Sequence, residues 1–257
     1  MNVPQRIALL PQRERRGSRL RCLLLTDGTR PEVAERLTSL VAPWGLVDSN
    51  RHYWLPQGLE RPQEAKLGET LNLLSGEQRR AVTDWWLAVR ERANTPNWDI
   101  ASTADIDGNE GLLLVEAKAH GSELKDDGKP IDGNAANHQR ICEALESATV
   151  GLNQIRPGWA LSSKSCYQLA NRFAWAWKIA SLGVPVILVY LGFIGASEMR
   201  DQGQPLADDK DWERRVRLHA EGIVPESAWS DLLLVGSKPL RALIRSMRLD
   251  IPSADNR

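Results

Sequence analysis

The chain has 257 residues, 42% of them hydrophobic and 26% charged, and a formal net charge of zero at pH 7. This composition suits one globular domain with a sizeable core, and the lack of net charge argues against a protein that coats nucleic acid by bulk electrostatics. The three cysteines have no paired spacing, and no signal peptide or transmembrane segment is evident, so we expect a cytoplasmic protein without disulfides and without a membrane partner.

Arginines are frequent near both ends of the chain, and they either reach a phosphate backbone or form solvated arms. They are Arg6, Arg13, Arg15, Arg16, Arg19 and Arg21 at the N-terminus and Arg241, Arg245 and Arg248 near the C-terminus. Residues 21–26 also form an apolar run, which is a candidate for one strand of a sheet.

Residues 75–94 carry the pattern of an amphipathic helix. Ser75 and Gln78 form a capping box at its start, and apolar side chains then recur at helical spacing until the stop signal at Pro96. A shorter amphipathic piece at residues 61–67 precedes this helix. We therefore expect a helical segment directly before the next feature of the chain.

That feature is a hairpin between residues 99 and 118. Two strand-like runs flank the sequence Asp107-Gly108-Asn109, and either Asp-Gly or Gly-Asn favours a two-residue turn. If Asp107 and Gly108 form the turn, Ile106 pairs with Asn109. The alternative turn shifts the pairing by two residues.

The hairpin brings three charged side chains together. In the first register Asp99 lies opposite Glu116, and in the second it lies opposite Lys118. Because strand side chains alternate and the turn has an even length, all three share one face in both registers. Facing carboxylates repel each other, and a divalent cation would remove that penalty. The run Leu112-Leu-Leu-Val115 before them is too apolar for a surface strand, although a solvated strand end is the simpler explanation of an isolated Glu-x-Lys.

The residues after the hairpin predict a loop and a helix. Residues 121–136 are polar and glycine-rich, as in a long loop beside a site, and residues 137–151 have a helical apolar face. Asn137 either caps this helix or holds substrate. His120 shares the parity of Lys118 and either contacts a phosphate or is an ordinary rim histidine.

Residues 166–182 predict a second core helix, closed by a glycine and a proline. Its two faces differ, because one is apolar and the other carries Gln168 and Arg172, four residues apart. The polar face either meets solvent or reaches the site, where Arg172 would contact a phosphate. Residues 184–194 are almost continuously apolar and predict a central buried strand.

Residues 196–257 are less informative. A charged helix is expected near residues 211–220, and the apolar residues between 231 and 247 would pack on the core as a strand or a helix. We interpret this part as a helical cap. It also offers a surface for a homodimer, the commonest symmetric assembly of soluble proteins.

The hairpin resembles the PD-(D/E)xK nuclease superfamily, also called the restriction-endonuclease-like fold. Asn97-Trp98-Asp99 stands where that family has Pro-Asp, with Pro96 two residues before its usual place, and Glu116-Ala117-Lys118 stands where it has (D/E)xK. The resemblance implies an α/β fold in which a mixed central sheet is flanked by helices, in the order helix, three antiparallel strands, helix, strand. The first strand comes either from residues 21–26 or from a rearranged sheet.

The resemblance covers about residues 60–195 of a single domain, with an N-terminal extension at 1–59 and the C-terminal cap at 196–257. It implies that Asp99, Glu116 and the backbone carbonyl of Ala117 bind Mg²⁺ or Mn²⁺. Lys118 would orient or deprotonate the attacking water. Gln168 resembles a glutamine that reaches the active site in some branches of the family.

Further site residues follow from the same resemblance. Leading helices in the family often lend another acid to the metal, and Glu64 and Glu77 are the candidates, although an acid near a helix start is also a simple partner of the helix dipole. His120, Asn137 and Arg172 are candidates for substrate binding.

The implied function is hydrolysis of phosphodiester bonds by an endonuclease or exonuclease, with DNA as the favoured substrate, in restriction, repair or anti-phage defence in a prokaryote. Two alternatives stay open. One is a catalytically inactive module of the same fold that binds nucleic acid or a protein partner. The other is an enzyme that uses the metal site on a different substrate. The three intact charged residues of the hairpin favour the nuclease.

Overall fold

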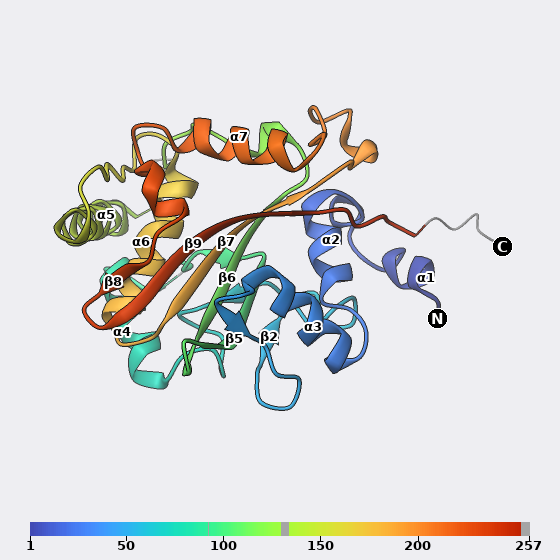
Figure 1. Cartoon of the computed structure of the whole chain (residues 1–257), viewed down its shortest axis with the longest axis horizontal. Helices are drawn as coiled ribbons and strands as arrows, with labels where there is room; N and C mark the ends of the chain where they lie inside the picture. Colours follow the sequence, from blue (N-terminus) through green and yellow to red (C-terminus); the bar gives the residue numbers. More distant parts are fainter. Residues whose placement is uncertain (92, 130–133, 253–257) are drawn as a thin grey trace.

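The structure is a computed structural model, and it describes residues 1–91, 93–129 and 134–252. A mixed, seven-stranded sheet separates two layers of helices (Figure 1). The helices are α1 (Val3–Ile7), α2 (Gly17–Leu25), α3 (Arg30–Val41), α4 (Gly76–Trp86), α5 (Ala135–Ile155), α6 (Tyr167–Ser181) and α7 (Asp209–Ala220), with short 3₁₀ helices at Gln12–Glu14, Gly121–Glu123, Ser197–Met199 and Glu226–Trp229.

The strands of the main sheet follow the order β1-β5-β6-β7-β9-β8, and β2 also pairs with β5. Strands β3 and β4 form a separate antiparallel pair. Their bounds are β1 (Gly45–Leu46), β2 (Trp54–Leu55), β3 (Ala65–Lys66), β4 (Asn97–Trp98), β5 (Ile100–Ile106), β6 (Asn109–Lys118), β7 (Val186–Phe193), β8 (Leu233–Val235) and β9 (Lys238–Met247).

Strand β7 occupies the middle of the sheet, as its apolar sequence predicts. It runs parallel to both β6 and β9, and every one of its residues is buried. A strand covered on both faces and paired on both edges has no solvated side, which accounts for the absence of apolar–polar alternation in its sequence.

The β5–β6 hairpin adopts the first of the two expected registers. Ile106 pairs with Asn109, and the turn residues Asp107 and Gly108 have φ angles of 49° and 76°. Two left-handed residues in succession are typical of a type I′ turn, which explains the Asp-Gly sequence. The same register places Ile100 opposite Val115, so Asp99, one residue earlier, lies level with Glu116.

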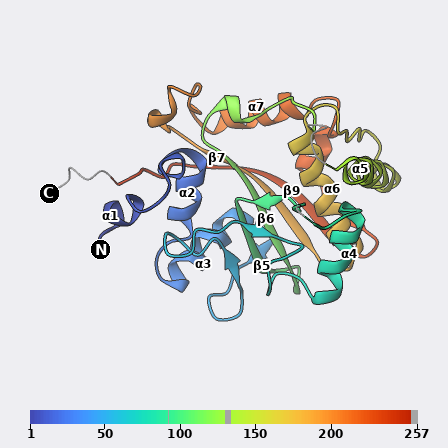
Figure 2. The ribbon, with the colours of Figure 1, turned by 180° about the vertical axis from the view of Figure 1, so that it is seen from behind.

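Helices cover the two faces of the sheet unequally (Figures 1 and 2). Leu112 and Leu114 of β6 pack in a cluster with α4, α5, α6 and α7, whereas Leu113, Val115 and Ala117 pack in a cluster with α2 and α3. Strand β6 is therefore apolar on both faces until its end. By alternation, Glu116 and Lys118 take the face covered by α6.

Aromatic rings hold α4 against α6. The ring centroids of Trp86 and Trp175 are 5.6 Å apart at an interplanar angle of 68°, and those of Trp85 and Trp177 are 6.3 Å apart. The first pair is edge-to-face and the second is tilted. An edge-to-face pair adds about 0.5–1.5 kcal/mol beyond the area it buries. The predicted capping box of α4 is confirmed at Ser75 and Gln78, but the helix ends at Trp86.

Two expectations about the sheet are wrong. Residues 21–26 belong to the end of α2 and the turn after it, because that helix is buried on two sides and needs the continuous apolar run that also suits a strand. The outer edge of β5 pairs with the two-residue strands β1 and β2 instead. The C-terminal part is not simply a helical cap either, since β9 is a ten-residue strand of the main sheet.

Two local expectations also need correction. The piece at residues 61–67 is not a helix, because Ala65 and Lys66 pair as β3 with Asn97 and Trp98. Helix α5 is capped by Asn134, whose side chain accepts from the backbone N–H groups of Ala136 and Asn137, so Asn137 is not the cap. Among the described residues, none of the helices combines the length and apolarity needed to cross a bilayer.

Candidate functional site

Charged side chains from three elements meet at the C-terminal end of β6. The carboxylate of Glu116 is 1% exposed, and both of its oxygens accept hydrogen bonds from cations. Lys118 Nζ lies 2.5 Å from Oε1, and Arg172 Nε, from α6, lies 2.5 Å from Oε2. A buried carboxylate with two cationic partners satisfies the rule that charges inside a protein are paired.

Asp99 joins this group from the bend between β4 and β5. Its Oδ2 atom accepts a hydrogen bond of 2.8 Å from the backbone N–H of Ala117. Because β5 begins only at Ile100, the Asp99 side chain supplies the acceptor that a continuing strand would have offered. The aspartate is thereby fixed beside Glu116, as the hairpin register predicts.

The two carboxyl groups differ in their electrostatics. Burial and the neighbouring charge of Glu116 raise the pKa of Asp99 to about 7, although Lys118 and the Ala117 N–H act in the opposite direction. For Glu116, burial raises the pKa, but Arg172 and Lys118 outweigh it and leave the pKa lowered. Near neutral pH, Glu116 is therefore ionised and Asp99 is the acid that exchanges a proton.

The polar face of α6 meets this site rather than solvent. Gln168 Oε1 accepts a hydrogen bond of 3.0 Å from Lys118 Nζ. Arg172 donates to the carbonyl of Asn97 at 2.8 Å and to Asn171 Oδ1 at 2.9 Å, and its guanidinium lies 4.5 Å from the ring centroid of Trp98. Because Arg172 is bonded to these groups and to Glu116, its contacts suit a residue that holds Glu116 in place. They suit the expected contact with a phosphate less well.

A cleft of about 1000 Å³ opens beside this group, and Asp99 and Glu116 are not among its lining residues in the described part of the chain. Lys118, Gln168 and Arg172 line it, together with segments around residues 91–97, 123–129 and 134–141. The lining carries both signs of charge, since Lys125 and Asp127 also face the cleft. A volume of this size accommodates a substrate larger than a metabolite fragment.

An additional acid lies close to Asp99. Strands β3 and β4 pair Ala65 with Trp98, so Glu64 is level with Asp99 on the side away from β6. The charge of Glu64 contributes to the raised pKa of Asp99. The other candidate, Glu77, is exposed in the first turn of α4, so Glu64 is the better placed of the two.

Two of the expected substrate-binding residues have other partners. The side-chain amide of Asn137 binds both backbone groups of Val89, at 2.7 and 2.8 Å, and so ties α5 to the segment after α4. His120 Nε2 lies 3.3 Å from Glu123 Oε1, and its backbone pairs with Pro205. Asn137 still lines the cleft, but His120 is not among its lining residues in the described part of the chain.

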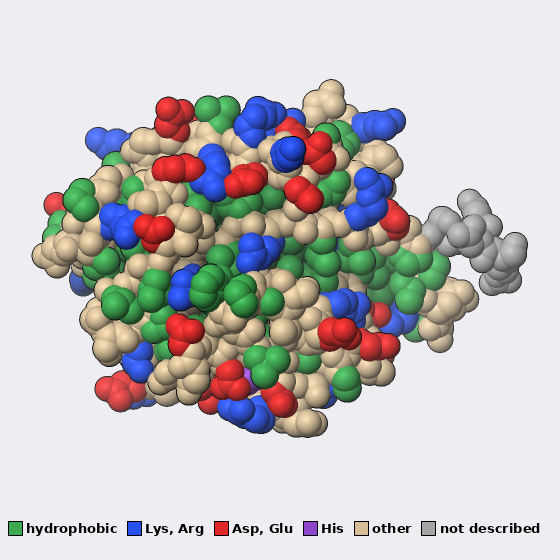
Figure 3. Space-filling view, in the orientation of Figure 1, with side chains coloured by type: hydrophobic (Ala, Val, Ile, Leu, Met, Phe, Trp, Pro, Cys, Tyr) green, Lys and Arg blue, Asp and Glu red, His purple; other side chains and the backbone are tan. Residues whose placement is uncertain are grey.

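Most of the N-terminal arginines are bonded within the fold, although the side chain of Arg13 is 89% exposed, as expected of a solvated arm. Arg6 pairs with Asp27, Arg16 with Asp201, and the buried Arg21 with Glu198. Near the other end, the guanidinium of Arg241 lies 3.9 Å from the ring centroid of Trp44. On the face seen in Figure 3, cationic and anionic side chains are interspersed, in keeping with the zero net charge.

Sequence reasoning missed Tyr190. Its register partner in the parallel ladder is Glu116, it is 2% exposed, and its hydroxyl has no hydrogen-bond partner among the described residues. Burial, together with the charge of Glu116, raises its pKa well above the ordinary value. No local signal marks this tyrosine, because its place beside Glu116 depends on the register of two strands about 70 residues apart in sequence.

Compared with protein-family models, with curated proteins and with solved structures, the chain matches none of them. Its α/β fold, with a mixed sheet between two helical layers, follows from the described residues. The function of the site must therefore be inferred from its own geometry.

Proposed function

We propose that this chain is a metal-dependent nuclease of the PD-(D/E)xK type, which hydrolyses phosphodiester bonds with DNA as the favoured substrate. The observation that carries the proposal is the meeting of Asp99, Glu116 and Lys118 at the end of a buried strand. Acids held in facing register there cost stability, and a purely structural role gives no reason to keep them.

The order of elements supports the proposal. Helix α3, the short strands β1 and β2, the hairpin β5–β6, helix α6 and strand β7 occur in the order helix, three antiparallel strands, helix and parallel strand. This is the order that the resemblance implies. Other elements stand between them: β3, α4 and β4 precede β5, and α5 precedes α6. In this assignment α3 takes the place of the leading helix, which the sequence pattern predicts at residues 75–94, and α4 becomes an insertion between the first and second strands. Strands β1 and β2 take the place of the first strand, for which residues 21–26 are the candidate in the sequence.

The donor set suits Mg²⁺ or Mn²⁺. Asp99 and Glu116 offer hard carboxylate oxygens, and each oxygen of Glu116 keeps a second lone pair beside the one bonded to a cation. The N–H and C=O of a strand residue point to the same side, so the Ala117 carbonyl is directed toward the side on which its N–H binds Asp99. Glu64 is within electrostatic range as a further acid.

The chemistry follows from these groups. A bound divalent ion would polarise the phosphoryl oxygen and lower the pKa of a water. In hydrolysis a water gives up a proton to solvent as its oxygen bonds to phosphorus, the bond from phosphorus to the leaving sugar oxygen breaks, and that oxygen takes up a proton. Lys118, fixed between Glu116 and Gln168, would orient the water and stabilise the charge that grows on the phosphate. Arg172 keeps the Glu116 carboxylate in place.

One observation favours the inactive module as a second candidate. Both oxygens of Glu116 are paired with Lys118 and Arg172, so the ion-pair network is already compensated by the protein's own cations. A domain that retained the fold for binding alone would be stable with such a network. Binding of nucleic acid without cleavage would support this candidate.

The test is cleavage of labelled linear, circular and single-stranded DNA, and of RNA, with Mg²⁺, Mn²⁺ or EDTA. We expect cleavage that requires the metal and that Lys118→Ala slows by about 100-fold or more, the usual effect of removing one charge-stabilising donor. Lys210→Ala is the matched control, because Lys210 is exposed on α7. If the folded protein cleaves none of these substrates with either metal, the proposal fails.

A further inference from the structure

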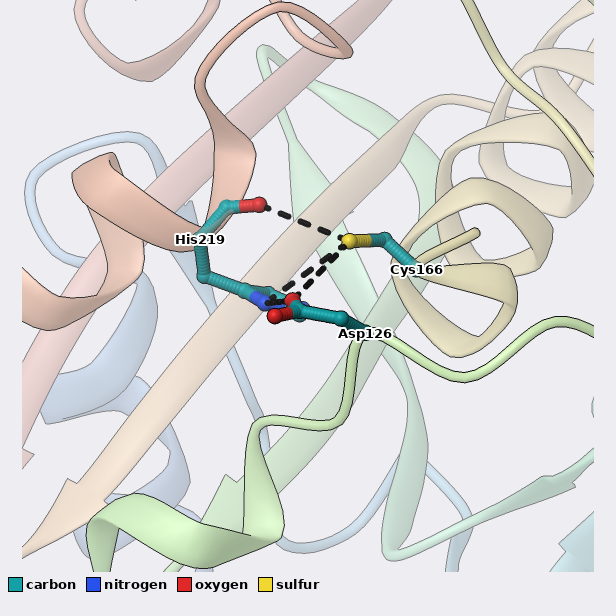
Figure 4. Close-up of side chains that lie close together, drawn as sticks. All are labelled: Asp126, Cys166 and His219. Carbon is teal, nitrogen blue, oxygen red and sulfur yellow. Dashed lines mark hydrogen bonds and ion pairs between the residues drawn. The ribbon is translucent and has the colours of Figure 1, made fainter. Parts of the chain in front are cut away.

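Three side chains outside the proposed nuclease site meet beside the N-terminal end of α6 (Figure 4). Cys166 directly precedes this helix, Asp126 lies in the loop after β6, and His219 lies in the last turn of α7. Cys166 Sγ is 3.3 Å from Asp126 Oδ1 and 3.9 Å from His219 Nδ1, and the distance from Nδ1 to Oδ1 is 3.1 Å. Three ligand atoms from three separate elements thus converge on one point.

The separations lie within about 0.4 Å of those expected between ligands around one small ion. Zinc binds sulfur at about 2.3 Å and nitrogen or oxygen at about 2.0–2.1 Å, which gives tetrahedral ligand–ligand distances of roughly 3.3–3.6 Å. The observed values of 3.1, 3.3 and 3.9 Å lie on both sides of that interval. We propose that Asp126, Cys166 and His219 bind a zinc-class transition metal ion, with the fourth position open to water.

The chemical types of the ligands determine which metal ions each site prefers. Thiolate and imidazole favour zinc, cobalt, nickel or copper over magnesium, whereas the oxygen-only set around Asp99 and Glu116 favours magnesium or manganese. The two sites would therefore take different ions from the same solution. This difference allows each site to be tested without the other.

The backbone holds two of the ligands in place. Cys166 has a left-handed backbone, with φ of 44°, which is uncommon for a residue other than glycine. Its N–H donates to the carbonyl of Asp126 at 3.0 Å, and the next N–H, of Tyr167, donates to the carbonyl of Asp127 at 3.1 Å. Cys166 is 6% exposed while the Asp126 side chain is 85% exposed, so the ion has both a buried anchor and an entry path.

Metal binding would convert a hydrogen-bonded cluster into a chelate. In the structure the Cys166 thiol donates to Asp126 Oδ1. On binding, the S–H bond breaks, its proton passes to solvent, and a bond from Sγ to the metal forms. The neighbouring residues Asp127, Tyr167 and Gln168 line the cleft. The ion would therefore also fix one wall of that cleft.

The experiment is a titration of the chelator-treated full chain with Co²⁺, followed by absorption spectroscopy. We expect one equivalent to produce a thiolate-to-cobalt charge-transfer band and the visible bands of a four-coordinate ion, and Zn²⁺ to displace it. Cys166→Ser and His219→Ala should abolish the charge-transfer band. Cys142→Ser is the matched control and should retain it, since Cys142 contacts Ser163 instead.

Two further variants keep the test independent of folding and of the nuclease proposal. Asp126→Asn changes an exposed side chain, so the fold is kept, and affinity for Co²⁺ should fall by at least the roughly 10- to 100-fold typical of changes around a metal. Asp99→Asn should leave the cobalt spectrum unchanged even if nuclease activity proves absent. A charge-transfer band that is missing in the unmodified chain, or that persists in Cys166→Ser, overturns the site.

Discussion

At the scale of single residues, Asp99 is the group of the candidate site whose charged form is unfavourable. Its pKa of about 7 results from burial and from Glu116, while Glu116 itself has Arg172 and Lys118 as counter-ions. The pKa of an aspartate in an unfolded chain is about 3.9. The folded protein therefore binds one more proton than the unfolded chain between these values, and its stability falls as the pH rises through that window.

Asp99→Asn should remove this loss of stability at high pH, because asparagine does not ionise. Its side-chain oxygen can still accept the hydrogen bond from the Ala117 N–H. We expect the variant to exceed the unmodified chain in free energy of unfolding by roughly 2–4 kcal/mol at pH 8, since one pKa unit corresponds to about 1.4 kcal/mol. The difference should shrink toward zero at pH 4. Urea unfolding in EDTA at several pH values measures it, and a gain that does not change with pH would show that ionisation of Asp99 is not its cause.

The sequence predicts the charged residues of the site because their arrangement depends on local periodicities. The two-residue alternation of the hairpin brings Asp99, Glu116 and Lys118 to one face, and helical spacing puts Gln168 and Arg172 together. Partners on distant elements follow no such local rule. Tyr190, Trp98, and the cluster of Asp126, Cys166 and His219 depend on how strands and helices pack, which no spacing encodes.

At the scale of elements, Gly192 lets α7 approach the sheet beside the site. It is the register partner of Lys118 on β7, and a Cβ atom there would lie 2.5 Å from Trp212 Cγ. Trp212 is 1% exposed and donates from its indole N–H to the carbonyl of Tyr190, so its side chain cannot move away from an added Cβ atom. The close contact of α7 with β7 thus requires glycine.

Gly192→Ala should destabilise the protein by about 1–3 kcal/mol, the usual cost of overpacking a core. The matched control is Gly76→Ala at the start of α4, where the nearest atoms to an added Cβ are arginine nitrogens at 3.7 and 3.8 Å. There alanine should be neutral or slightly stabilising, because it favours a helix more than glycine does. Chemical denaturation compares the two, and equal effects at both positions would contradict the packing argument.

Elements with strong local signals are predictable, and short ones are not. The buried strand β7, the helix α6 and the capping box of α4 follow from apolar runs, stop signals and caps. The two-residue strands β1 and β2 leave no recognisable pattern, since they owe their conformation to pairing with β5. For β9 the apolar residues suit a strand or a helix equally, and only its parallel pairing with β7 decides.

At the scale of the whole molecule, the segments at residues 1–59 and 196–257 are integral to the sheet. The first contributes α2, α3, β1 and β2, and the second contributes β9. Arg21 of α2 links them, since it donates to Glu198 and to the carbonyl of Leu249. Several of their arginines, among them Arg6 and Arg21, are thereby paired within the fold, whereas Arg13 stays exposed.

For the proposed binding of DNA, this distribution of charge predicts a weak dependence on salt. Lys118 and Arg172 in the cleft are paired with Glu116, which leaves exposed groups such as Lys125 to meet phosphates. Since each phosphate contact contributes about 0.9 to the slope of log affinity against log salt, we expect a slope of magnitude about 1–3, far below the value near 10 of a protein that depends on phosphate contacts. Fluorescence anisotropy of labelled DNA over a range of salt, without divalent metal, measures this slope. Lys125→Ala should lower it by about 1, whereas Lys210→Ala on α7 should not change it. A steep slope, or a slope that Lys125→Ala leaves unchanged, would mean that binding occurs away from the cleft.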